Sequence, residues 1–137
     1  AERLDDGPAA IAAYRRLLDD FGQAPGPLEA LDRLYTKSGD APALAETLEA
    51  RLALAEGKEA RLSLLARLGA LRAERLGDVP GALDAYRDAL VLDGSDAPVR
   101  GALEAMLAGG EGQAEAARML RPLYEAEEQQ EKLLGVL

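Results

Sequence analysis

The chain repeats itself at a spacing of 72 residues, and this internal repeat limits the folds open to it more than any other feature. The segment from Ala1 to Gly22 aligns without a gap on the segment from Ala73 to Gly94, with 12 identities in 22 positions. The identities include scarcer residue types: Pro8 with Pro80, Tyr14 with Tyr86 and Gly22 with Gly94. Self-similarity at a fixed spacing is the signature of repeat architectures. We therefore expect an array of similar units.

Start and stop signals divide the chain into helices. The motif Asp-x-Pro occurs at Asp6, Asp40, Asp78 and Asp96, where an Asp side chain can cap free backbone N–H groups and Pro has no N–H to leave unpaired. Glycines suited to left-handed caps follow each apolar stretch, at positions 22, 39, 57, 77, 94 and 109–110. Apolar spacings of three and four residues between these signals predict helix and not strand. The expected helices are 7–21, 26–38, 41–56, 58–76, 79–92, 97–108 and 113–130, and the tail from Glu131 either continues the last helix or begins another.

The composition excludes several classes of function. The chain has no Cys, His, Asn or Trp, so Ser-His and Cys-His nucleophile pairs and thiolate or imidazole metal sites are impossible. A net charge of −9 argues against nucleic acid as a partner. No apolar run approaches the roughly 20 residues that span a bilayer, and no signal peptide is recognisable. We expect a soluble protein without cofactor or metal, cytoplasmic in preference to periplasmic, and the Ala/Arg/Leu bias indicates a bacterial source.

The remaining polar patterns also fit helix surfaces and ends. Adjacent carboxylates such as Asp19-Asp20 and Glu127-Glu128 diverge by about 100° around a helix, so they do not readily share a ligand. The stretches GDVPG and AGGEGQ lack the strand, Lys and Ser/Thr of a phosphate-binding loop. The tyrosines, at helical spacing, are expected to be core wedges. The sequence therefore predicts no enzyme activity.

The spacing of the helix pairs is similar to that of a known family. Successive second helices begin at positions 6, 40, 78 and 112, in steps of 34, 38 and 34 residues. A two-helix period of 34 residues resembles the tetratricopeptide repeat. In the unit with the best match, Gly77, Ala82, Tyr86 and Ala89 stand at the family's inter-helix glycine, small, aromatic and small positions. The preceding unit matches with Leu28, Leu31, Tyr35 and Gly39.

The chain also departs from the family pattern at particular places. Asp32 and Glu104 occupy a position that the family usually gives to a small residue, and Glu111 stands where the third unit should carry its glycine. The second unit carries four extra residues near its start. On this register the chain is a single repeat domain, 1–137. It comprises a partial unit 1–24, complete units 25–58, 59–96 and 97–130, and the start of a further helix at 131–137.

The resemblance implies a fold and a function. The fold is all-α, with antiparallel helix hairpins stacked as a right-handed superhelical solenoid. Family members are mostly non-enzymatic scaffolds that hold a peptide or helix of another protein in a concave groove, lined mainly by the first helix of each unit. Carried onto this chain, the groove positions with the most informative side chains are Glu29, Arg33, Lys37, Leu64, Arg67, Leu71 and Arg75. The same positions include Thr36 and Glu74 and, in the third unit, Gly101, Ala105 and Ala108.

Two interpretations of the groove cations stay open. Arg33, Lys37, Arg67 and Arg75 form a basic strip that binds acidic or C-terminal groups of a peptide through charge-assisted hydrogen bonds. Alternatively they are solvated and paired within their own helices to Glu29, Glu59 or Glu74. Because the chain has no Asn, the paired Lys and Asn clamp that some family members use for a terminal carboxylate is not expected.

The two ends of the chain suggest an alternative function. Both lie in mid-pattern, so we expect a piece of a longer array. The C-terminal segment carries apolar residues that need cover, namely Leu133, Leu134, Val136 and Leu137. A homodimer through this segment is therefore one expectation. The corresponding alternative to a peptide-binding scaffold is a structural module that joins copies through their ends.

Overall fold

The computed structural model describes residues 6–109 and 111–136, and every regular element in these ranges is an α-helix. In chain order the helices are α1 (Asp6–Phe21), α2 (Pro25–Ser38), α3 (Ala41–Leu54), α4 (Lys58–Glu74), α5 (Val79–Leu92), α6 (Ala97–Leu107) and α7 (Gln113–Val136). The all-α class expected from the sequence is confirmed. The helix boundaries agree with the sequence-based ones to within two residues except at the end of α7.

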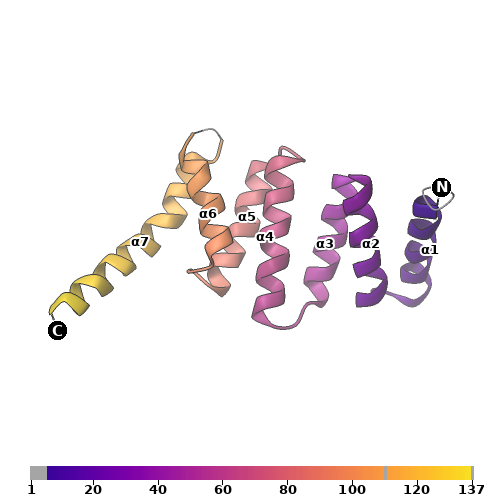
Figure 1. The fold of residues 1–137 in the computed structure, drawn as a ribbon, viewed down its shortest axis with the longest axis horizontal. Coiled ribbons are helices and arrows are strands. Elements are labelled where there is room, and N and C mark those ends of the chain that lie inside the picture. The colour runs from indigo at the N-terminus through magenta and orange to yellow at the C-terminus, as the bar shows by residue number, and fades with distance from the viewer. Residues whose placement is uncertain (1–5, 110, 137) are drawn as a thin grey trace.

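The helices stand side by side along the length of the molecule, with α1 and α7 at opposite ends (Figure 1). Each helix contacts the next one in the chain, α4 also contacts α6, and α5 also contacts α7. Short connections between helices return the chain alongside the helix just completed. The result is an elongated row of helical hairpins, in which most contacts are made between neighbours.

Three of the four Asp-x-Pro motifs start helices in the way the sequence predicts, whereas Asp6 is itself the first residue of α1. The Asp40 carboxylate accepts a hydrogen bond from the Ala43 backbone N–H at 3.2 Å, and Asp78 accepts one from Gly81 at 3.0 Å. Asp96 caps α6 in the same manner. Each motif places Pro within the first turn, where a missing N–H costs nothing.

The glycine stop signals mark the helix ends only approximately, because the C-cap residue is Ala55 in α3, Arg75 in α4 and Ala108 in α6. Gly39 ends α2 in the left-handed region, with a φ of 77°. Gly94 does not adopt this conformation, because α5 has already ended at Leu92 and Asp93 is extended. A Cβ added to Gly94 would lie 2.9 Å from the Leu123 Cδ2 atom. A larger residue here would therefore require the end of the Leu123 side chain to shift.

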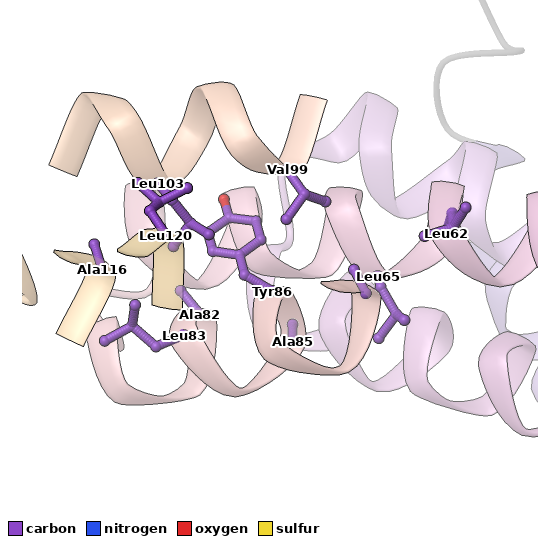
Figure 2. Packing of buried hydrophobic residues seen from close by; sticks show 11 residues of the cluster. Leu62, Leu65, Ala82, Leu83, Ala85, Tyr86, Val99, Leu103, Ala116 and Leu120 are labelled. Atoms are coloured by element: carbon purple, nitrogen blue, oxygen red, sulfur yellow. The ribbon is translucent and has the colours of Figure 1, made fainter. Parts of the chain in front are cut away.

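The hydrophobic core consists of two clusters that share α4. One cluster joins α4 to α5, α6 and α7 around the buried Tyr86 ring, which Figure 2 shows in the middle of its apolar neighbours. The other joins α2, α3 and α4, with side chains of α1 packed against it. Leu62 and Leu65 of α4 belong to the first cluster, and Leu64 and Leu68 to the second. Helix α4 is therefore the element that connects the two halves.

The sequence left open whether the tail from Glu131 continues the last helix or begins another. Helix α7 is continuous to Val136, so residues 131–136 extend it and do not begin a further helix. Its C-terminal half projects beyond the other helices in Figure 1. The expected dimer contact through Leu133, Leu134, Val136 and Leu137 concerns side chains outside the described residues.

Candidate functional site

An open pocket of about 500 Å³ lies where α2, α3 and α4 meet. Its lining residues are Glu29, Asp32, Arg33, Thr36 and Lys37 from α2, Arg51 from α3 and Arg67 from α4. The five α2 residues recur at spacings of three and four, so they lie on one face of that helix. With four cations and two carboxylates, the lining has a net charge of +2 in a chain whose total is −9. The pocket is thus a local basic site in an acidic protein.

The buried Asp32 carboxylate holds two of the four arginine and lysine side chains in place. Its residue is 4% exposed. Arg67 donates to both carboxylate oxygens, at 2.7 and 2.8 Å, and Arg51 donates at 2.5 Å. The Thr36 hydroxyl adds a fourth hydrogen bond at 3.2 Å. Asp32 therefore links α2, α3 and α4 at the pocket.

The environment of Asp32 keeps it ionised. Burial by itself would raise the pKa of this carboxyl group, but the hydrogen bonds and positive charges of Arg67 and Arg51 outweigh burial and lower its pKa. The hydrogen bond to Asp32 raises the pKa of Arg67 against the opposing effect of its own burial. At neutral pH this group of side chains therefore carries one negative and two positive charges.

The other two cations of the pocket are exposed and unpaired. Among the described residues, neither Arg33 nor Lys37 has an ion pair or a side-chain hydrogen bond. They are spaced by four residues, so both project from the same face of α2. Because nothing in the described chain neutralises them, these two cations are available to an anionic group that enters the pocket.

A second pocket lies on the other side of α4, toward α6. It has a volume of about 400 Å³ and is lined by Glu59, Leu62, Ser63, Ala66, Arg67, Asp96 and Pro98, from α4 and the start of α6. Arg67 lines both pockets. The two cavities therefore adjoin at this side chain, and together they span α2, α4 and α6.

The structure brings together four of the seven groove residues expected from the family resemblance, namely Glu29, Arg33, Lys37 and Arg67. Leu64 is 6% exposed and belongs to the core cluster of α2, α3 and α4, so its expected place in the groove is wrong. Leu71 is partly buried against the same cluster. Arg75 caps the end of α4 and donates to the Gly39 backbone oxygen at 3.3 Å, away from the pocket lining.

The expected pairing of Arg67 within its own helix is also wrong, because its partner is Asp32 of another helix. Sequence reasoning missed Asp32 and Arg51 as site residues. The signal for Asp32 was present, since a carboxylate stands where the repeat family has a small residue. No comparable signal marks Arg51, because its partner lies 19 positions away and on a different helix.

Comparisons of the chain with protein-family models, curated proteins and solved structures find no match. In the described part of the chain, no three carboxylates are grouped so that they could hold a metal ion. None of the described helices combines the length and the apolar character needed to cross a membrane. The account of the site therefore depends on its own geometry and charge.

Proposed function

We propose that the protein is a non-enzymatic, tetratricopeptide-like scaffold that binds an acidic segment of another protein in the pocket formed by α2, α3 and α4. The observation that carries this proposal is the pair of unpartnered cations, Arg33 and Lys37, beside an arginine fixed by Asp32. The predicted units pair α2 with α3, α4 with α5 and α6 with α7, and each of these pairs is in contact. The pocket residues of α2 and α4 belong to the first helices of those units.

Charge explains why the occupant should be acidic. The rest of the chain is strongly negative, so an acidic segment is repelled from most of its surface and attracted to this pocket, whose lining is net positive. Carboxylates accept charge-assisted hydrogen bonds from Arg and Lys, which are stronger than neutral ones. The pocket thus selects by charge where the segment binds.

The ion pairs of Asp32 with Arg51 and Arg67 favour binding because they fix the two arginine side chains before a ligand arrives. Arg51 and Arg67 do not need to be immobilised when a ligand arrives, because Asp32 already holds them. Ordering a flexible side chain at an interface costs about 0.5–1.5 kcal/mol. Asp32 removes part of this cost and is a positioning residue, since it is not itself expected to touch the ligand.

The proposal is tested by charge reversal with a matched control. A fluorescein-labelled peptide with four Glu residues is titrated with the parent chain, with the Arg33→Glu, Lys37→Glu variant and with an Arg16→Glu, Arg121→Glu variant. All four positions are exposed, and both variants lower the net charge equally. We expect saturable binding that weakens at least tenfold only in the pocket variant. Equal weakening in both variants would mean that only the overall charge matters and would refute the pocket.

A further inference from the structure

We propose that the site reads a two-part segment, with acidic side chains over α2 and an apolar side chain in the adjoining pocket between α4 and α6. This inference rests on the proposed function and specifies its ligand. It depends on three features of the described residues: the Arg67 side chain that lines both pockets, the opposite net charge of the two linings, and the apolar surface of the second pocket.

The pocket between α4 and α6 disfavours carboxylates. Its two acidic residues, Glu59 and Asp96, outnumber its one cation, Arg67, which already makes two hydrogen bonds to Asp32. No described residue pairs with the Glu59 carboxylate. A segment that is acidic along its whole length would therefore gain attraction at α2 and meet repulsion at α4 and α6.

The surface between those charges suits an apolar side chain. Leu62, Ala66 and Pro98 contribute apolar atoms to the pocket, and Ser63 is the one uncharged polar residue of the lining. Leu62 itself is 5% exposed and anchored in the core, so this part of the pocket has a firm base. Removing an aliphatic side chain from water in such a place favours binding.

The dimensions set the length of the segment. The Asp32 and Arg67 side chains join α2 to α4, and α4 contacts α6 directly. Because packed helices lie roughly 8–10 Å apart, a path from the outer face of α2 across α4 to the start of α6 is at least about 20 Å long. An extended peptide advances about 3.3 Å per residue. A segment of roughly six residues therefore reaches both pockets, with its acidic and apolar parts separated by one or two residues.

Two six-residue peptides of equal charge isolate the apolar part. The first is Glu-Glu-Glu-Ala-Leu-Leu and the second is Glu-Glu-Glu-Ala-Ser-Ser, both blocked at their termini. We expect the Leu peptide to bind the parent at least tenfold more tightly. A Ser63→Glu variant, which places a third carboxylate in the second pocket, should reduce the affinity for the Leu peptide to that for the Ser peptide. Ala60→Glu is the matched control, since this residue is exposed on the same helix and lines neither pocket.

The orientation is measured with a nitroxide label on either end of the Leu peptide and a ¹⁵N-labelled protein. A label at the Leu end should broaden the backbone amide signals near Ser63 and Ala97, and a label at the Glu end those near Arg33 and Lys37. Equal affinity of both peptides at the α2 pocket, or broadening in the reverse order, would overturn this inference and leave the proposed function standing. No saturable binding of either peptide would refute both.

Discussion

Asp32 is the residue on which the shape and charge of the pocket depend. An ionised carboxylate with so little exposure would be costly without compensation, and here two guanidinium groups supply it. Both arginines remain partly exposed, with 26% and 41% of their side-chain surface open. Arg51 and Arg67 thus keep part of their hydration, while the Asp32 carboxylate is fully paired. This limits the cost of burying the charged group at the edge of the core.

Replacing Asp32 by Asn should lower the free energy of unfolding at pH 7 by about 1–3 kcal/mol, because an amide cannot accept charge-assisted bonds from both arginines. The loss stays moderate because Arg51 and Arg67 can turn toward water. Urea unfolding followed by circular dichroism measures the change. A Glu29→Gln variant is the control, since Glu29 lines the pocket but is exposed. Equal destabilisation by both changes would contradict the role given to Asp32.

The same carboxylate predicts a pH dependence. Because its pKa is lower in the folded chain than in the unfolded chain, the unfolded state binds more protons in acid. The stabilisation is therefore complete above the unfolded pKa of about 3.9 and is lost as the pH falls through the folded value. The difference in stability between the parent and Asp32→Asn should shrink between pH 5 and pH 2.5. A difference that stays constant over this range would show that folding does not lower the pKa of Asp32.

Two glycines within helices should respond in opposite directions to replacement by Ala. A Cβ at Gly69 would lie 2.7 and 2.8 Å from the Cζ and Cδ1 atoms of Tyr86, whereas a Cβ at Gly101 meets nothing within 4 Å. Overpacking costs about 1–3 kcal/mol, and Ala favours helix over Gly by about 1 kcal/mol. Thermal unfolding should show Gly69→Ala less stable and Gly101→Ala more stable than the parent. Stabilisation by Gly69→Ala would mean that α4 and α5 pack less closely than described.

At the scale of elements, helix α4 shows what the sequence could and could not predict. Its leucines at every third position indicate a helix correctly. They do not reveal that Leu62 and Leu65 serve one core cluster while Leu68 serves another. A spacing of three residues between leucines identifies one apolar face of a helix. Helix α4 lies between two core clusters and is apolar on more than one face. The position expected for Leu64 in the groove is wrong for the same reason.

Helix α7 is held to α6 by a group of polar side chains. Arg100 lies 5.3 Å from the centre of the Tyr124 ring and pairs with Glu127, while the Tyr124 hydroxyl donates to Glu104 at 2.5 Å. This hydrogen bond is the main reason that the pKa of Tyr124 is raised. In the register of the tetratricopeptide resemblance, Glu104, like Asp32, stands where a small residue is expected. Both departures thus coincide with polar contacts between helices.

An Arg100→Ala variant should loosen α7 beyond Pro122. It removes the cation over Tyr124 and the partner of Glu127 together, while the apolar contacts of Leu120 remain. Amide hydrogen exchange in residues 123–128 should accelerate by roughly threefold to tenfold. The control is Arg121→Ala on the exposed side of α7. Unchanged exchange in the Arg100 variant would show that these contacts do not hold the helix.

At the scale of the whole molecule, the two core clusters predict stepwise unfolding. In the described chain, α4 and the Leu52 side chain of α3 join the two clusters, and arrays with mainly neighbour contacts open in parts. Leu48→Ala should cost about 2–5 kcal/mol and accelerate hydrogen exchange in α2 and α3 more than in α5 and α6. Leu103→Ala should do the reverse. Uniform acceleration along the chain in both variants would indicate one cooperative unit.

Much of the architecture is predictable because its signals are local. Caps such as Asp40 and stops such as Gly39 act within one turn, so helix number and boundaries follow from short stretches. The site is only partly predictable, because the Asp32–Arg67 pair joins residues 35 positions apart. Arg33 and Lys37 could be proposed as site residues from their places in the repeat register. Arg51 could be recognised as a site residue only once the packing of α3 against α2 and α4 was known.

The most direct test of the proposed binding function is photo-crosslinking from inside the pocket. A photoreactive residue replaces Glu29, which is exposed and lines the pocket, or Asp88, which is exposed on α5 outside it. Each variant is irradiated in an extract of the source cells with and without the acidic peptide. We predict an adduct with another protein at position 29 that the peptide suppresses, and no such adduct at position 88. Adducts equal at both positions, or formed only with copies of this chain, would contradict the account and favour assembly through the chain ends.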